Sequence, residues 1–494
     1  MKKAPTGFTP IIAVDRDSAT PLHRQIYEAF RQGIVSGRLR RGQRIPSTRA
    51  LAAELRVSRF PVLNAYAQLL AEGFFTSRIG AGTVVSESLP GPVAAPGALP
   101  HTPSPATKAG PRPLAQRTSK LPPPDLSPWL LNWGAFGVGQ VAVDELPRQL
   151  WSSLVARHIR NMKNRAYHYS SQMGSENLRQ AIAEYLRTAR SLRCDASQII
   201  IVSGSQQALE LSARILVDPG SPVWMEEPGY LLAREVFSLA GARLVPVPVD
   251  GEGLNVSEGI RRCRNARIAY VTPSHQFPLG HTMSASRRLQ LLDWAHSAGS
   301  WIIEDDYDSE YRYESPPVAS VQGIDTDARV IYTGTFSKVL FPALRLGYIV
   351  IPPDLVDHFV VCRRHMDLGM PGLYQEALAE FIREGHFARH IRRMRALYRQ
   401  RRDVLVANIE RELGSMVEIS GSEAGMHLTL LLRRRNDDRR IALQAAKQGL
   451  WAWPLSSTYF GESPSPGFIL GFGSTQIDEI PPAVRKLRKL LTQA

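Results

Sequence analysis

The sequence predicts a multidomain chain, with a small N-terminal module of three helices and a β-hairpin ahead of a larger α/β domain. The N-terminal part shows helical hydrophobic periods, a proline-rich stretch follows, and the remainder alternates buried-type strands with helical stretches. The 494 residues also exceed what one hydrophobic core usually holds. We expect an N-terminal domain over 1–86, a linker over 87–128, and a large domain over 129–494 whose smaller subdomain starts at about residue 352.

The N-terminal module begins with a helix expected over 21–36, because apolar residues recur every four positions from Leu22 to Ile34. Ser47 and Ser58 are suitable N-caps for a second and a third helix. Two short strands then flank a Gly-Ala-Gly turn that begins at Gly80. Three helices followed by a hairpin make a winged helix-turn-helix.

This module resembles the GntR family of regulators over residues 20–86. The family pattern G-x-L-x-x-G-x-x-[IL]-P-S-x-R-x-L-A is met from Gly37 to Ala52. The resemblance implies binding to double-stranded DNA, with these residues at or near the duplex: Arg49, Ser58, Arg59, Phe60, Pro61 and Gly80. The start of a helix in the major groove points its first side chains at base edges, so Arg59 is suited to a bidentate contact with guanine.

The charge distribution agrees with a nucleic-acid partner. The chain has a formal net charge of +15, and residues 1–86 hold 13 Lys and Arg against 5 Asp and Glu, a net charge of +8. A basic module of this kind favours contact with phosphates, although solubility alone would also explain it. The following segment, 87–128, contains 12 prolines among small and polar residues, which predicts a semi-extended linker.

The large domain is expected to contain a mostly parallel sheet. Short apolar runs with helical stretches between most of them predict strands at 199–202, 223–225, 242–247, 268–271, 301–303 and 330–332. Such alternation is typical of α/β folds.

A lysine motif, Thr-Gly-Thr-Phe-Ser-Lys, follows the last of these strands and ends at Lys338, with Arg345 seven positions on. A lysine amine can form a Schiff base with an aldehyde, and hydroxyls with an arginine can hold a phosphate. Pyridoxal 5'-phosphate carries both groups. Taken alone, the motif would fit a solvated loop better than a cofactor site.

A second motif lies 33 residues upstream of Lys338, where a buried-type strand leads into Glu-Asp-Asp-Tyr-Asp. Asp305 at the end of that strand can keep a pyridine nitrogen protonated, and Tyr307 on the same side can reach the ring hydroxyl. A solvated strand exit would explain these charges but not their pairing with the lysine motif.

Together the two motifs resemble fold-type I enzymes that use pyridoxal phosphate, of the aminotransferase group, over residues 130–494. The resemblance implies that Lys338 is the Schiff-base (catalytic) lysine. It implies cofactor contacts from Asp305, Tyr307, Tyr230, Ser205, Gln206, Thr335, Ser337, Arg345 and, from the partner subunit, Tyr169.

The sequence departs from that group at two places. Phe277 stands where an asparagine usually bonds the cofactor ring, which leaves His275 and Gln276 as alternatives for that role. The arginine that binds the substrate carboxylate is also missing, since the sequence contains no arginine between Arg440 and Arg485. Arg234 is a candidate replacement, with packing as its alternative role.

The order of the parts resembles the MocR subfamily of GntR-type bacterial transcriptional regulators. That resemblance implies a regulator that binds an operator through the winged helix and senses an amine or a B6 vitamer through an aminotransferase-like domain, as a head-to-tail homodimer. A working aminotransferase with an accessory DNA-binding domain is the alternative. The three widely spaced cysteines and the absence of a signal-peptide run or a spanning segment predict a cytoplasmic protein without membrane contact, and no metal is expected.

Overall fold

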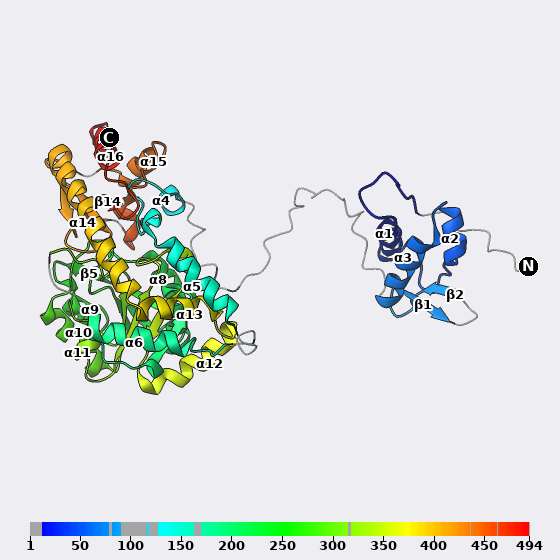
Figure 1. Ribbon diagram of the computed structural model, residues 1–494, viewed down its shortest axis with the longest axis horizontal. Helices are drawn as coiled ribbons and strands as arrows, with labels where there is room; N and C mark the ends of the chain where they lie inside the picture. Colours follow the sequence, from blue (N-terminus) through cyan, green and yellow to red (C-terminus); the bar gives the residue numbers. More distant parts are fainter. Residues whose placement is uncertain are drawn as a thin grey trace, which may run out of the picture. The chain divides into compact units, whose positions relative to one another are not determined.

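The computed structural model describes residues 12–78, 82–89, 115, 118, 127–162, 168, 170–314, 318–434, 436–461 and 463–493. The chain divides into two compact units, Met1–Pro113 and Leu114–Ala494 (Figure 1). Within the described ranges, none of the helices combines the length and the apolar character that a membrane crossing requires.

The N-terminal unit is a winged helix-turn-helix, as predicted. Its elements are α1 (Leu22–Val35), α2 (Thr48–Glu54), α3 (Arg59–Ala71) and the antiparallel strands β1 (Phe75–Arg78) and β2 (Gly82–Val85). Its core forms around Phe30, Tyr66 and Phe75, whose rings meet edge to face with centroids 5.2 to 5.6 Å apart. Aromatic pairs prefer this geometry, so one ring from α1, one from α3 and one from β1 fix the hairpin against the helices.

The two serine caps behave differently. The Ser47 side chain accepts a hydrogen bond from the amide of Ala50 at 3.2 Å, as an N-cap does. Ser58 occupies the N-cap position of α3 but makes no capping hydrogen bond. The physical reason is Pro61, because the third residue of the helix normally donates its amide to the cap and proline has none.

The sheet of the large unit has eight strands in the order β3-β10-β9-β8-β7-β4-β5-β6. Their bounds are β3 Ile199–Val202, β4 Pro222–Glu227, β5 Arg243–Asp250, β6 Gly253–Leu254, β7 Ile268–Val271, β8 Trp301–Asp306, β9 Val330–Thr335 and β10 Gly347–Val350. The pairs β9-β8, β8-β7, β7-β4 and β4-β5 are parallel, and β10 runs antiparallel to β3 and β9. The sheet is therefore mostly parallel, as expected, and it contains two strands, β6 and β10, that were not predicted from the sequence.

Helices cover both faces of this sheet. Their bounds are α5 Arg148–Arg160, α6 Glu176–Arg190, α7 Ser205–Leu216, α8 Leu231–Leu239, α9 Val256–Cys263, α10 Ala285–Ala298, α11 Val321–Ile324, α12 Val356–Asp367 and α13 Leu373–Arg383. The short helix α4, Pro128–Leu131, lies instead beside the C-terminal elements of the unit (Figure 1). In β3, Ile199 and Ile201 join one hydrophobic cluster while Ile200 and Val202 join another, because successive side chains of a strand point to opposite faces.

A smaller antiparallel sheet, in the order β11-β12-β14-β13, forms the C-terminal part of this unit. Its elements are α14 His386–Leu413, β11 Val417–Ser420, β12 His427–Leu432, α15 Asp438–Ala446, β13 Trp453–Pro454, β14 Gly467–Gly471 and α16 Ile480–Thr492. Figure 1 shows α14, α15, α16 and β14 grouped at one end of the unit, beside α4. Short 3-10 turns link several elements, among them Val143–Glu145, Pro342–Leu344 and Leu455–Thr458.

Candidate cofactor site and nucleic-acid interface

A cavity of about 330 Å³ lies where the ends of β8 and β9 and the start of α7 meet β12 and β13. It brings together nine of the residues predicted to hold the cofactor: Lys338, Asp305, Tyr307, Tyr230, Ser205, Gln206, Thr335, Ser337 and Arg345. The other lining residues are Leu130, Val138, Gly139, Leu232, Tyr270, Thr272, Phe277, Asp308, Pro342, Met426, His427 and Trp453.

Lys338 projects into this cavity just beyond β9, and its Nζ donates a hydrogen bond to the carbonyl of Gly139 at 2.9 Å. Burial lowers the pKa of Lys338, so more of the amine is neutral and nucleophilic. Gly139 has φ +73°, and a Cβ built there would overlap Nζ. The positive φ favours glycine here, and any larger residue would also displace the lysine amine from this position.

Asp305 lies at the end of β8 with 4% of its surface exposed. Its Oδ2 accepts a hydrogen bond from the Tyr270 hydroxyl at 2.7 Å, and its Oδ1 accepts one from Thr333 at 3.2 Å. Burial raises the pKa of Asp305 to about 6. A cationic ring nitrogen opposite the carboxylate would offset that burial, so the donor set fits a pyridinium group.

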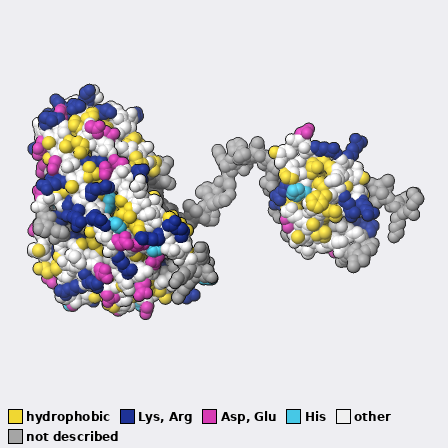
Figure 2. Space-filling model, viewed as in Figure 1, with side chains coloured by type: hydrophobic (Ala, Val, Ile, Leu, Met, Phe, Trp, Pro, Cys, Tyr) yellow, Lys and Arg dark blue, Asp and Glu magenta, His cyan; other side chains and the backbone are white. Residues whose placement is uncertain are grey.

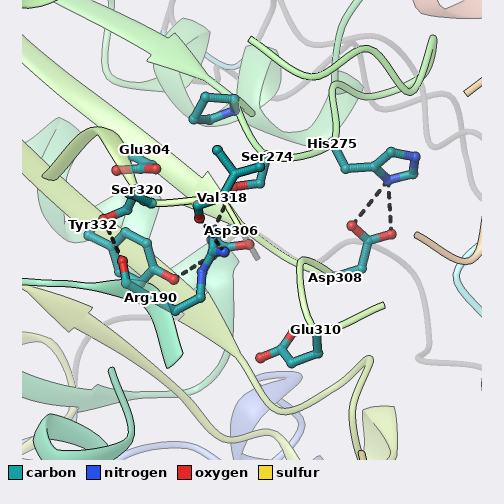
Figure 3. A network of polar contacts seen from close by, with 12 residues as sticks. Arg190, Ser274, His275, Glu304, Asp306, Asp308, Glu310, Val318, Ser320 and Tyr332 are labelled. Atoms are coloured by element: carbon teal, nitrogen blue, oxygen red, sulfur yellow. Dashed lines mark hydrogen bonds and ion pairs between the residues drawn. The ribbon is translucent and has the colours of Figure 1, made fainter. Parts of the chain in front are cut away.

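Tyr307 reaches the same cavity from the loop after β8. Its hydroxyl donates to the backbone carbonyl of His275 at 2.8 Å and lies 3.1 Å from His275 Nδ1. That ring nitrogen also lies 3.1 Å from both carboxylate oxygens of Asp308 (Figure 3). His275 thus lies outside the cavity lining and contacts Tyr307, rather than facing the space where the cofactor ring would be.

The opposite end of the cavity is formed by the first turn of α7. Gly204, with φ +82°, precedes Ser205 and leaves the first amides of the helix available, a typical anion site. The Arg345 guanidinium donates to the carbonyl of Ser203, and a Cβ at Gly204 would lie 3.3 Å from it. Helix amides, hydroxyls and a guanidinium together fit a phosphate group.

Two of the predicted contacts are directed elsewhere. The Gln276 side chain donates to the carbonyl of Pro228 at 2.9 Å and accepts from the amide of Leu279 at 3.0 Å, so its polar atoms are already paired with backbone groups of two loops. Arg234, the candidate for a carboxylate, donates to the carbonyl of Thr458 and stacks on Phe460 at 3.9 Å, which is a packing role. Tyr169 lies outside the described residues.

The acidic run at the end of β8 is buried rather than solvated. Glu304 accepts the amides of Val321 and Gln322 at 3.0 and 2.9 Å. Asp306 forms an ion pair with Arg190 at 2.7 Å, with both side chains 3% exposed (Figure 3). Each carboxylate in the run therefore has a separate partner. Asp305 and Asp308 both line the cavity, and Asp305 is the one that belongs to the strand β8 itself.

The predicted DNA-contacting residues lie on α2, α3 and the turn between them. Arg49, Ser58, Arg59 and Phe60 are exposed, and Phe60 is 70% exposed, an unusual value for a phenylalanine; Pro61 is half-buried. The Arg59 Nε donates to the Thr48 hydroxyl at 3.1 Å, which links the starts of the two helices. Gly80 lies outside the described residues. In Figure 2, Lys and Arg side chains border a hydrophobic area on the visible face of this unit.

Two family models match the chain. Residues 22–85 match "Bacterial regulatory proteins, gntR family", and residues 135–467 match "Aminotransferase class I and II". The chain is 40% identical over 479 residues to the "Probable rhizopine catabolism regulatory protein MocR" of Rhizobium meliloti, covering 97% of this chain and 95% of that protein. It is 31% identical over 471 residues to the "HTH-type pyridoxine biosynthesis transcriptional regulator PdxR" of Corynebacterium glutamicum, covering 95% and 96%.

Among solved structures, the chain resembles LysN, the α-aminoadipate aminotransferase from Thermus thermophilus complexed with N-(5'-phosphopyridoxyl)-L-leucine. The TM-score is 0.68 at 27% identity, covering 77% of this chain and 95% of that chain. The predicted fold class and cofactor are thereby confirmed. The chain belongs to the MocR-type branch of the GntR family of bacterial transcriptional regulators, which joins a DNA-binding winged helix to an aminotransferase-like domain whose cofactor is pyridoxal phosphate.

Proposed function

We propose that this regulator carries pyridoxal phosphate on Lys338 and uses the loaded pocket to sense a primary amine or a B6 vitamer, which changes how the winged helix engages its operator. The observation that carries the proposal is the buried cavity in which a lysine of lowered pKa, a buried carboxylate and a helix N-terminus converge. That set matches the chemical groups of the cofactor one by one.

The roles of the side chains follow from their surroundings. The neutral Lys338 amine bonds the aldehyde, and Asp305 holds a proton at the ring nitrogen. Tyr307 would contact the ring hydroxyl and Tyr230 the ring, and the start of α7 with Thr335, Ser337 and Arg345 would hold the phosphate. When bound, the cofactor supplies an aldehyde that exchanges one amine for another and a ring that accepts electrons.

A sensor is favoured over an enzyme by the surroundings of the ring. Phe277 stands in the usual asparagine position, with its ring centroid 5.8 Å from that of Tyr230 and 5.7 Å from that of Trp453. The alternatives for that position are engaged elsewhere: His275 contacts Tyr307 and Asp308, and Gln276 donates to the Pro228 carbonyl. Turnover requires the amine to be held so that its α-proton faces the freed lysine. In the described lining, Arg345 is the only cation besides Lys338, and it is bound to the Ser203 carbonyl, so an amino-acid carboxylate has no cationic side chain to hold it.

For the DNA-binding unit we propose that Arg59 contacts a base edge and that Arg49 and Ser58 contact phosphates, with Phe60, Pro61 and the turn at Gly80 beside them. Exposed arginines at a helix start suit this division. We further propose a head-to-tail homodimer in the cytoplasm, in which Tyr169 serves the cofactor of the partner subunit. Sedimentation of the full chain tests this directly, and a monomer at micromolar concentration would refute the dimer.

The test of sensing compares operator affinity with and without amines and vitamers, alongside steady-state transamination with common amino-acid and keto-acid pairs. A sensor should show ligand-dependent operator affinity, since a ligand that binds one conformation better shifts the equilibrium. Turnover of about one per second or faster, within the usual enzyme range, together with ligand-independent operator binding would favour the aminotransferase alternative.

A further inference from the structure

The cavity wall away from the phosphate end differs in chemistry from the rest of the pocket. It is formed by Met426 and His427 at the start of β12, by Trp453 in β13 and by Phe277. The His427 ring lies 5.5 Å from the Phe277 ring, which in turn lies 5.7 Å from the Trp453 ring. A molecule attached at Lys338 would therefore extend into a mainly aromatic and apolar space.

This wall carries no cation among the described residues. Lys338 and Arg345 are the cationic side chains in the described lining, and Arg345 is fixed at the phosphate end through the carbonyl of Ser203. Arg234 is directed to Glu227 and to the Thr458 carbonyl. A ligand carboxylate that lost its water here would have no positive partner, and such burial is strongly unfavourable.

His427 makes the wall an acceptor of hydrogen bonds. Its Nε2 lies 3.2 Å from the carbonyl oxygen of Pro278, which can only accept, so Nε2 carries the hydrogen. Burial lowers the pKa of His427 to about 3, so the ring is neutral and its Nδ1 keeps a lone pair. Asp308 also lines the cavity, as a buried carboxylate beside His275. The Asp308 carboxylate repels an anion, and both groups can accept hydrogen bonds from N–H or O–H donors.

We propose that the ligand sensed by this pocket is a primary amine without a carboxylate on its amine-bearing carbon, whose frame contacts Trp453 and Phe277 and whose hydroxyl or N–H donor faces His427. This inference rests on the proposed sensing function and specifies its ligand class. It also explains why the pocket has side chains for every part of the cofactor but a wall that does not suit an amino-acid carboxylate.

The test uses triplets that share one side chain: an amino acid, the amino alcohol in which CH2OH replaces the carboxylate, and the simple amine in which hydrogen replaces it. Each is titrated into the full-length, cofactor-loaded protein, with the visible absorbance and the thermal midpoint as readouts. We expect the amino alcohol and the amine to bind at least about tenfold more tightly than the amino acid, with the amino alcohol ahead because it can donate to His427.

A variant tests the role of the wall. His427→Arg should raise the affinity for the amino acid relative to the amino alcohol, while His427→Gln, which keeps an acceptor and a donor, should retain the preference of the unmodified protein. If His427→Arg does not fold, as judged by its circular dichroism, the triplets in the unmodified protein decide by themselves.

The outcomes distinguish an error in the ligand class from an error in amine sensing itself. Equal or tighter binding of the amino acids overturns the ligand class but leaves sensing intact. Absence of any response to all three members of every triplet, in absorbance, thermal midpoint and operator affinity, overturns this inference together with amine sensing.

Discussion

Arg59 and Lys338, the cations on which the two proposed activities depend, lie in opposite surroundings. Arg59 is exposed at the start of α3, and a hydroxyl of Thr48 is its hydrogen-bond partner. Lys338 faces a cavity, donates a hydrogen bond to the Gly139 carbonyl and has a pKa lowered by burial. A phosphate-covered partner approaches from solvent and needs charged groups that are still hydrated, whereas a small cofactor needs groups already desolvated and positioned. Substitutions in the N-terminal unit are therefore expected to weaken DNA binding, whereas substitutions in the large unit are expected to impair cofactor attachment or folding.

The largest expected effect is at Lys338. Lys338→Ala should abolish covalent attachment of the cofactor, because no other group in the described lining is an amine. The visible absorbance of the attached cofactor should disappear, and borohydride should no longer trap it on the protein. Lys447→Ala, which lies beyond the cavity lining, is the matched control. If Lys338→Ala keeps the spectrum of the unmodified protein, the assignment is wrong.

The buried ion pair between Arg190 and Asp306 should give the next largest effect. Asp306→Asn leaves a buried guanidinium without its partner charge, which should lower the free energy of unfolding of the large unit by about 3–5 kcal/mol. Glu210→Gln breaks the exposed pair with Arg214 and should change it by less than about 1 kcal/mol. Denaturant titration of the full chain measures both, and equal effects would contradict the contrast between buried and exposed charges.

At the DNA-reading surface the effect should be smaller and confined to binding. Arg59→Ala should weaken the cognate complex by about 1–3 kcal/mol and relax base preference at one position, without lowering the stability of the unit. Arg24→Ala is a suitable control, since Arg24 pairs with Glu28 on α1. Affinity for the operator should also fall steeply with salt. Equal losses on cognate and random DNA would identify Arg59 as a phosphate contact instead.

The cofactor pocket should respond to pH in a defined direction. Asp305 has a raised pKa of about 6 in the free protein, and binding of a protonated ring requires its charged form. Below about pH 6 the free protein takes up a proton there, so cofactor affinity should fall by up to about tenfold per pH unit. Protonation of Lys338 weakens binding in the same direction. Asp305→Asn should bind weakly and flatten this part of the profile, and an unchanged slope in that variant would point to another group.

The smallest effect distinguishes the two serines of the N-terminal unit. Ser47→Ala removes a capping hydrogen bond and should lower the stability of that unit by about 1 kcal/mol. Ser58→Ala should change the stability of the unit by only a few tenths of a kcal/mol, because Ser58 makes no capping hydrogen bond at the start of α3, where Pro61 has no amide hydrogen to donate. Thermal unfolding measures both. If the two variants were equally destabilised, the structural difference between the caps would have no energetic meaning.

The sequence by itself determined the elements whose signals are local. The winged helix follows from hydrophobic periods and serine caps within 86 residues, and the lysine motif and Asp305 both lie at ends of apolar strands. A strand end fixes which side chains emerge at a sheet edge, so the nine predicted residues that line the cavity could be named from the expected strand ends and the family resemblance before their distances were known.

Tertiary structure alone decided the contacts between residues far apart in the chain. Gly139 lies 199 positions before Lys338, and only folding shows that its carbonyl holds the amine. Three other side chains have such distant partners. His275 contacts Asp308, Gln276 donates a hydrogen bond to the Pro228 carbonyl, and Arg234 donates one to the Thr458 carbonyl. Buried polar groups must find partners wherever the fold places them, and no local pattern records that choice.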